Sequence, residues 1–348
     1  MKLVKIAIHD RVSSFSKRWI EYCQQNGISF QIVDCHATNI IDSLSDVDVL
    51  LWHFNHRSFE DTLIAKHVLR AVELSGKKVF PDSNTCWHFD NKIAQKYVLE
   101  SIKAPCVPTD VFVNKKAALE WIQKADYPLV FKLSKGAGSY SVQLVRSRAN
   151  AEKLVKKAFG SGFKPLGRYV SEMGISFKNT SHQRKIYLLK KAYKIPRFLR
   201  ESHVINKMIG RERGYVYFQK FIPENKFDTR ITVINGNCAF GFTRNVRPND
   251  FRASGSGSIN YDLKLIEPDA IKLSFDVAKK LKAQSIAFDF VRDSKGCFWI
   301  TEISYGFDSR CVHQCSGYWD DQLIWHEGHK WPEDLIISDM IEQVKFQQ

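Results

Sequence analysis

Long apolar segments are absent from this chain of 348 residues. No run reaches about 18 apolar residues, the length that a membrane-spanning helix needs, so the sequence predicts no transmembrane segment. The opening residues MKLVKIAIHD read as a charged β-strand and lack the apolar core of a secretory signal. Internal repeats and low-complexity tracts are missing as well, which favours an ordinary globular protein of two or three domains.

Cysteine pairs with a regular spacing are also absent. The eight cysteines are scattered along the chain, several of them inside apolar runs. Without a secretory signal they predict reduced thiols in a cytoplasmic protein. One close set, Cys311, His313 and Cys315 with His326 and His329, alternates too tightly to match a tetrahedral zinc site well.

Acidic residues are outnumbered, with 37 Asp and Glu against 52 Lys and Arg, so the formal net charge is +15. This balance indicates anionic partners such as nucleotides, acidic sugars, lipid headgroups or nucleic acid, and does not choose among them. Between Gly160 and Gly214 there are thirteen Lys or Arg and three acids. Residues 183–201 allow two interpretations: a basic helix on the anionic inner face of a membrane, or a solvated basic face packed on the core.

Alternating strand and helix patterns divide the chain into three regions. Residues 1–104 predict an α/β domain with a parallel sheet covered on both faces. Residues 105–215 predict a small lobe with a basic insert at about 160–214, and residues 216–348 a large lobe with a C-terminal cap. The expected strands and helices are 2–8, 15–25, 29–33, 48–52, 59–74, 78–80, 90–101, 111–113, 115–125, 129–133, 142–145, 149–159, 215–222, 228–235, 238–247 and 268–282.

The stretch Ser285–Ser304 carries the strongest chemical signal. It predicts two strands joined by the turn Arg292–Gly296, and each strand places a carboxylate, Asp289 or Glu302, inside an apolar run. A carboxylate there is strongly unfavourable unless its charge is compensated. Two acids on paired strands suit Mg²⁺, which takes one or two carboxylates together with substrate phosphates.

A glycine loop between two predicted strands adds a candidate phosphate site. Lys135–Ser141 lacks the spacing of a P-loop but allows backbone N–H groups to approach phosphate oxygens. Lys132 lies in the apolar strand just before the loop, where its charge requires an anionic partner. Lys92 begins a predicted helix, and taken alone it is better explained as a surface lysine behind an N-cap.

Arginines follow on two further strands. Asp228 and Arg230 share one strand, and Arg244 and Arg247 lie on the next. Arginines that project from strands toward one region favour bidentate binding of phosphate or carboxylate. The loop that begins at Arg252 then offers a second anion-binding rim.

In this order the features resemble the ATP-grasp superfamily. A helix lysine, a strand lysine, a glycine loop, FQKFI, D-x-R, R-x-x-R and a final D…E-x-S follow one another across residues 85–310. The resemblance is closest to carboxylate–amine ligases of the ribosomal-protein glutamate ligase type. It implies an ATP-grasp fold, with an N-terminal parallel-sheet domain and two α+β lobes that sandwich ATP.

The resemblance also implies ligands for ATP and its metal. Asp289 and Glu302 would hold Mg²⁺ or Mn²⁺, and Ser304 stands where the family usually has an Asn ligand. The implied nucleotide contacts are Lys92, Lys132, Lys135, Gly136, Ala137, Gly138, Ser139, Gln219, Lys220, Phe221, Ile222 and Asp228.

The implied reaction is amide formation through an acyl phosphate, with Arg230, Arg244 and Arg247 meeting the charge of the transferring phosphoryl group. Lys220 stands where an acid is common in the family, which leaves the identity of the nucleotide open. Two alternatives remain: an ATP-grasp kinase that phosphorylates a hydroxyl, and a non-catalytic basic protein that binds nucleotide, membrane or nucleic acid. Nucleic acid is the least expected partner.

The residues that bind the acceptor substrate are indicated less clearly by the sequence. The candidate contacts are His53 and His56 at a predicted strand end, and Arg252, Ser254 and Gly255 in a loop. The blocks WHF, FPDSNTCWHFD and RERGYVYFQ are similar to those of chains found with surface-polysaccharide genes. That similarity implies an acidic sugar or glycan precursor joined to an amine. The oligomeric state is left open.

Overall fold

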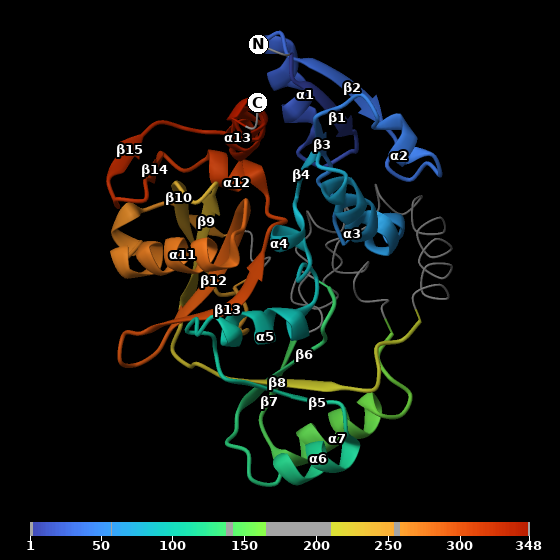
Figure 1. The fold of residues 1–348 in the computed structure, drawn as a ribbon. Helices are drawn as coiled ribbons and strands as arrows, with labels where there is room; N and C mark the ends of the chain where they lie inside the picture. Colours follow the sequence, from blue (N-terminus) through green and yellow to red (C-terminus); the bar gives the residue numbers. More distant parts are fainter. Residues whose placement is uncertain (1–2, 57, 137–141, 165–209, 254–257, 347–348) are drawn as a thin grey trace, which may run out of the picture. The chain divides into compact units, whose positions relative to one another are not determined.

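The computed structural model describes residues 3–56, 58–136, 142–164, 210–253 and 258–346. These residues form two compact units (Figure 1). The first unit combines Met1–Cys106 with Glu224–Gln348, and the second is the continuous stretch Val107–Pro223. The division of the chain into three regions therefore stays a prediction.

A four-stranded parallel sheet forms the N-terminal part of the first unit, in the order β2-β1-β3-β4. Its central strands are short apolar runs, and Ile6, Ile8 and Leu50 have no exposed surface. Helices α1 and α3 pack against the sheet, as buried parallel strands require. The elements are β1 Lys5–His9, α1 Ser16–Gln25, β2 Ser29–Val33, α2 Ile40–Ser43, β3 Val49–Leu51, α3 Phe59–Leu74 and β4 Lys78–Phe80.

Polar residues follow the carboxyl ends of these strands. His9 is the last residue of β1, and Asp34 comes directly after β2. Helix α3 begins after Ser58, whose hydroxyl accepts the Asp61 N–H at 2.9 Å and thereby fixes the first turn. Because parallel strands end at one edge of a sheet, these side chains gather there.

A seven-stranded sheet, ordered β13-β12-β9-β10-β14-β15 with β11 beside β10, forms the rest of the first unit. Along β9, Ile231 and Val233 pack with α11, so Asp228 and Arg230 point to the opposite face of the sheet. The elements are α4 Ser83–Cys86, α5 Lys92–Ser101, β9 Phe227–Ile234, β10 Cys238–Asn245, β11 Ile259–Asn260, α11 Pro268–Leu281, β12 Ser285–Arg292, β13 Phe298–Ser304, α12 Ser309–His313, β14 Gly317–Trp319 and β15 Trp325–Glu327.

A C-terminal helix that the sequence analysis did not identify, α13 (Pro332–Phe346), packs on α1. Trp19 Nε1 donates to the carbonyl oxygen of Glu333 at 3.1 Å. Arg18 forms a bidentate pair with Asp334 at 2.7 and 2.6 Å. The apolar face of α13 joins the same core as the N-terminal sheet, so the end of the chain completes the core begun at its start.

The second unit is built on an antiparallel sheet, in the order β5-β8-β6-β7. Helices α6 and α7 cover it and share a separate core that includes Phe131 and Phe218. The predicted basic stretch 183–201 lies outside the described residues. The elements are β5 Thr109–Phe112, α6 Lys115–Trp121, β6 Leu129–Lys132, β7 Val142–Val145, α7 Arg148–Ala158 and β8 Val216–Lys220.

No helix within the described part of the chain is long and apolar enough to cross a membrane. All eight cysteines lie among the described residues, and each is a free thiol, also as predicted.

Candidate functional site

Asp289 and Glu302 lie directly opposite each other on β12 and β13, as the hairpin pattern predicts. On the other side of β12, Arg230 of β9 lies opposite Asp289. Glu302, Asp289 and Arg230 thus form a row across three strands on one face of the sheet, which we call the charged row. The pairing of β12 with β13 shifts register between Asp289 and Phe290, directly after the charged row.

Two arginines bind the Asp289 carboxylate. Arg230 donates from Nε and Nη2 to its two oxygens at 2.7 and 2.9 Å. Arg244 Nη2 lies 2.9 Å from Asp289 Oδ2, and Arg244 Nε donates to Asp228 Oδ1 at 2.8 Å. None of these four side chains is more than 20 % exposed. Charges buried to this degree are tolerated because each one has an opposite partner in bidentate geometry.

The network keeps Asp289 ionised. Burial alone would raise the pKa of this carboxyl, but the adjacent Arg230 and Arg244 guanidinium groups hold it well below its usual range. Burial would likewise lower the pKa of Arg244, and the Asp289 and Asp228 charges raise it instead. Asp289 therefore carries its negative charge at neutral pH, as a metal-binding carboxylate must.

Lys92 extends the charged row at Glu302. It is the first residue of α5, after Asn91, whose side chain caps the helix by accepting the Ala94 N–H at 3.1 Å. Lys92 Nζ lies 3.3 Å from Glu302 Oε1, and its side chain is 5 % exposed, against 35 % for Glu302. Lys92 is therefore not a surface lysine, and the Glu302 charge accounts for its burial.

In the contacts that join these groups in the described part of the chain, three carboxylates meet three cations. Asp289 and Glu302 offer hard oxygen donors on adjacent strands, which is the donor type that Mg²⁺ and Mn²⁺ prefer. Their oxygens have lone pairs beyond those that accept from the basic side chains. The donor set fits a divalent cation that brings further ligands such as phosphate oxygens. The six groups are Asp228, Asp289, Glu302, Arg230, Arg244 and Lys92.

Ser304, the third predicted metal residue, lies on β13 two positions after Glu302 and therefore on the same face. Its hydroxyl donates to the carbonyl oxygen of Gly306 at 3.0 Å and accepts the Gly306 N–H at 3.1 Å. These bonds shape the turn after β13. Metal binding by Ser304 and a ribose contact by Asp228 stay predictions.

Arg247 and Arg252 lie on the turn that follows β10. The Arg247 N–H donates to the carbonyl oxygen of Arg252 at 3.1 Å, and the Arg252 guanidinium binds both oxygens of Asp250 at 2.9 and 2.6 Å. Burial and then the Arg252 charge lower the pKa of Arg247. The structure thus brings Arg230 and Arg244 together on Asp289 and places Arg247 on a neighbouring turn.

The second unit contains the lysine and the glycine loop of the predicted phosphate site. Lys132 is the last residue of β6 and is 6 % exposed. The Lys135 N–H donates to Glu212 Oε2 at 3.4 Å, at the start of the loop. Gly136 has a φ of +99°, which favours glycine. Ala137, Gly138 and Ser139, like Ser254 and Gly255 of the later loop, lie outside the described residues.

The predicted adenine segment begins where β8 ends. Gln219 is buried, and its Nε2 donates to Thr109 Oγ1 at 3.2 Å. Lys220 is the last residue of the strand and is exposed, and Phe221 and Ile222 follow it outside the strand. Nucleotide contacts by this segment stay predictions.

His53, a predicted substrate contact, is buried beside the N-terminal sheet. Its ring stacks on Phe15 with the centroids 3.7 Å apart, and its Nδ1 accepts the Phe15 N–H at 3.2 Å. Burial and then the Arg11 charge lower the pKa of His53 to about 3, so the ring is neutral. His56 lies near Phe89, with ring centroids 6.2 Å apart. Substrate binding by His53, His56 or Arg252 stays a prediction.

The close cysteine–histidine set has separate partners. His326 Nε2 lies 2.6 Å from Asp320 Oδ2, and His329 Nδ1 donates to the carbonyl oxygen of His313 at 2.8 Å. Cys315 Sγ lies 3.6 Å from the carbonyl oxygen of Gly241. The absence of a zinc site at these residues stays a prediction.

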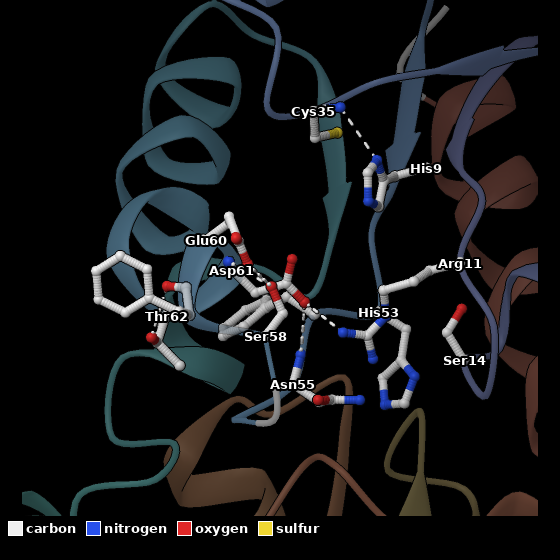
Figure 2. Close-up of polar contacts among 12 residues, drawn as sticks. His9, Arg11, Ser14, Cys35, His53, Asn55, Ser58, Glu60, Asp61 and Thr62 are labelled. Atoms are coloured by element: carbon white, nitrogen blue, oxygen red, sulfur yellow. Dashed lines mark hydrogen bonds and ion pairs between the residues drawn. The ribbon is translucent and has the colours of Figure 1, made fainter. Parts of the chain in front are cut away.

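The sequence analysis missed a polar cluster at the carboxyl ends of β1 and β2. Arg11 Nη1 donates to Asp61 Oδ2 at 2.7 Å, and His36 Nε2 lies 3.0 Å from Asp61 Oδ1. Figure 2 shows Arg11 and Asn55 on one side of the Asp61 carboxylate and His9 above it. A signal was present, because polar residues directly follow these strands in the sequence.

No family model matches the sequence. No curated protein matches it either. Solved structures do match. A RimK domain protein ATP-grasp from Sphaerobacter thermophilus has a TM-score of 0.55 at 16% identity, over 97% of this chain and 100% of that one. D-alanine–D-alanine ligase from Bacillus anthracis has a TM-score of 0.57 at 14% identity, over 99% and 100%. Biotin carboxylase from Campylobacter jejuni has a TM-score of 0.60 at 14% identity, over 97% and 71%.

These similarities extend over nearly the whole chain and identify the fold. The protein has the ATP-grasp fold, as the order of its motifs predicts. Among the described residues, one parallel and two antiparallel sheets agree with the predicted α/β and α+β architecture.

Proposed function

We propose that the protein is an ATP- and Mg²⁺-dependent carboxylate–amine ligase. The charged row and Arg244 carry this proposal, because together they place two hard carboxylates and two fixed arginines on one face of a sheet in the ATP-grasp fold. The similar structures support the nucleotide: the C. jejuni biotin carboxylase was solved in complex with β-γ-ATP, and the B. anthracis ligase also with ATP.

Asp289 and Glu302 are the residues that would hold the divalent cation. When bound, that cation shields the phosphate charges and polarises the γ-phosphoryl group. Arg230 and Arg244 present positive charge beside it. Their bonds to Asp289 and Asp228 fix both guanidinium groups before substrate arrives, so little reorganisation is needed during the reaction.

In the first step, an oxygen of the substrate carboxylate bonds to the γ-phosphorus while the bond to the β–γ bridging oxygen breaks and ADP leaves. The transition state spreads negative charge over the phosphoryl oxygens, and the arginines Arg230 and Arg244 stabilise it. Lys92 and Lys132 are the proposed lysine contacts to the phosphates. Each is buried, which suits a lysine that binds an anion.

In the second step, the amine nitrogen attacks the carbonyl carbon of the acyl phosphate. Phosphate leaves with the bonding electron pair, the nitrogen loses a proton, and an amide remains. Arginine charge that stabilises the transferring phosphoryl group also stabilises the departing phosphate.

We further propose an acidic sugar or glycan precursor as the carboxylate substrate. The formal charge of +15, and the resemblance of some sequence blocks to those of surface-polysaccharide chains, favour an acidic glycan. Contact of residues 183–201 with an anionic membrane would present a lipid-linked precursor. Failure of the protein to sediment with anionic liposomes at low salt would contradict the membrane contact and leave the ligase proposal standing.

The reaction is tested by screening pairs of carboxylates and amines for ADP release, with mass spectrometry of the products. The wild-type protein is expected to release ADP and form an amide only when both substrates are present. Asp289→Asn is expected to lower kcat/KM by at least about 100-fold, because it removes a charge that acts on the transferring group.

Asp276→Asn is the matched control, because Asp276 is an exposed acid of α11 in the same unit. It is expected to leave turnover unchanged. ADP release that needs only a hydroxyl compound would identify a kinase. No ADP release above the Asp289→Asn background with any pair would contradict the ligase proposal.

A further inference from the structure

Three side chains with metal-binding atoms meet outside the charged row, at the carboxyl ends of the parallel strands. His9 ends β1, His36 follows β2, and Asp61 lies in the first turn of α3. One ligand atom from each lies within 4.8 Å of the others. The rings of His9 and His36 have centroids 5.0 Å apart and are nearly perpendicular, so both approach the same space.

We propose that His9, His36 and Asp61 bind a divalent transition-metal ion such as Zn²⁺ and leave one coordination position open. Two imidazoles and one carboxylate form a ligand set that suits zinc and related ions. Mg²⁺ prefers oxygen ligands alone, so this site is chemically distinct from the charged row. The proposal therefore does not depend on the ligase function.

The Asp61 carboxylate is held in the way that metal-binding carboxylates are held. Its Oδ2 accepts from Arg11 Nη1 at 2.7 Å and from the Asn55 N–H at 3.1 Å (Figure 2). Its Oδ1 faces His36 Nε2 instead. Hydrogen bonds to one oxygen orient the carboxylate and leave the other oxygen for a metal.

His36 is oriented in the same manner. Its Nδ1 lies 3.5 Å from Asp34 Oδ1, on the side of the ring away from Asp61. At this distance Asp34 makes no hydrogen bond to the ring, but its charge favours a proton on Nδ1, which leaves Nε2, the nitrogen that faces Asp61, as the ligand atom. The His36 side chain is 29 % exposed, which gives an ion a path to the site.

His9 supplies the third ligand from the buried side. Its Nδ1 accepts the Cys35 N–H at 3.0 Å and lies 3.2 Å from the carbonyl oxygen of Val33. With the proton on Nδ1, the ring donates to Val33, and Nε2 has the lone pair that a metal needs. Without a metal, Nδ1 accepts the Cys35 N–H, and the proton of the neutral ring is on Nε2. Metal binding at Nε2 therefore requires the tautomer with its proton on Nδ1.

A hydrogen bond between His36 and Asp61 alone would explain two of the three groups. It leaves unexplained why His9, 6 % exposed, brings a third ligand atom to the same place. Tetrahedral zinc with bonds of about 2.0–2.1 Å separates its ligand atoms by about 3.3 Å. His36 Nε2 and Asp61 Oδ1 are already 3.0 Å apart, and the three ligand atoms lie within 4.8 Å of one another, so a modest contraction of the cluster would reach this spacing.

The test uses the full-length protein without a histidine tag, stripped of metal by chelation and dialysis. Zn²⁺ is titrated against a fluorescent chelator, and Co²⁺ is added separately to record its visible absorption. We expect about one tightly bound ion per chain. The cobalt spectrum should lack the intense thiolate charge-transfer band, because the ligands are nitrogen and oxygen. Zn²⁺ should also raise the melting temperature of the wild-type protein.

His36→Gln and His9→Gln are expected to weaken zinc binding by at least the roughly 10–100-fold that loss of a supporting group costs. His67→Gln is the matched control, since His67 is an exposed histidine of α3, the helix that bears Asp61. His36 is partly exposed, so its variant is expected to fold, and circular dichroism checks this. Absence of tight binding by the wild type, or unchanged binding by the folded His36→Gln variant, would overturn the proposal.

Discussion

At the scale of single residues, Arg244 is the group on which the charged row depends most. It contacts both Asp228 and Asp289, and none of the three side chains is more than 13 % exposed. Arg244→Met would leave two buried carboxylates with only Arg230 to compensate them. We expect the free energy of unfolding, measured in urea, to fall by about 3–5 kcal/mol, the usual cost of breaking a buried ion pair.

Arg310→Met provides the comparison for this prediction. Arg310 pairs with Asp308, and the two side chains are 78 % and 47 % exposed. Loss of an exposed pair changes stability by less than about 1 kcal/mol. Adding Asp228→Asn to Arg244→Met should recover part of the loss, because it removes an uncompensated charge. If Arg244→Met and Arg310→Met lowered the free energy of unfolding equally, the buried network would not stabilise the fold.

The sequence identified most groups of the charged row but not their partners. Asp289 and Glu302 stand out because each interrupts an apolar strand. Their facing positions follow from a short turn, which is local information. The choice of Asp289 and Asp228 as partners of Arg244 depends on the register of β9 with β10 and β12, which involves strands that are distant along the chain.

At the scale of elements, helix α13 was missed although its sequence carries a helical signal. Ile336, Ile337, Met340, Ile341 and Val344 recur at helical spacing and are all buried. Its packing partner α1 lies at the opposite end of the chain, and no local pattern indicates that contact. The cluster of His9, His36 and Asp61 was missed for the same reason, since its members come from the end of β1, the segment after β2 and the first turn of α3.

Helix α13 also predicts a pH dependence of stability. Glu333 lies in its first turn and is 3 % exposed, and burial raises its pKa to about 7. An unfolded Glu titrates near 4.3, so between about 4.3 and 7 the folded state holds a proton that the unfolded state has lost. Stability therefore falls as pH rises through this window, by roughly 3–4 kcal/mol in total, and levels off above it.

Glu333→Gln tests this dependence, because an amide does not titrate. The free energy of unfolding of the variant minus that of the wild type should increase by roughly 3 kcal/mol from pH 4.5 to pH 7.5. The buried neutral rings of His53 and His88, with pKa values lowered to about 3 and about 4, act in the opposite direction, but they are present in both proteins and cancel. A difference that does not vary with pH would contradict the raised pKa of Glu333.

At the scale of the whole molecule, the net positive charge of the chain contrasts with the paired charges of the site. The chain has a formal net charge of +15. In the described site, however, the three carboxylates Asp228, Asp289 and Glu302 pair with three cations, Lys92, Arg230 and Arg244. A site without excess negative charge has little attraction for a bare divalent cation. It suits an ion that arrives already bound to a polyanion, which the surrounding positive field also attracts.

This balance predicts that Mg²⁺ and nucleotide stabilise the protein together. Mg²⁺ alone should leave the melting temperature nearly unchanged, whereas Mg²⁺ with ATP should raise it. At a nucleotide concentration of about 100 times Kd the gain is about 2.7 kcal/mol, which corresponds to several degrees for a chain of this size. The same mixture should stabilise Asp289→Asn less than the control Asp276→Asn. If Mg²⁺ alone gave the full shift, the protein would hold the ion with its own ligands, and the balance of charges in the row could not be what controls metal binding.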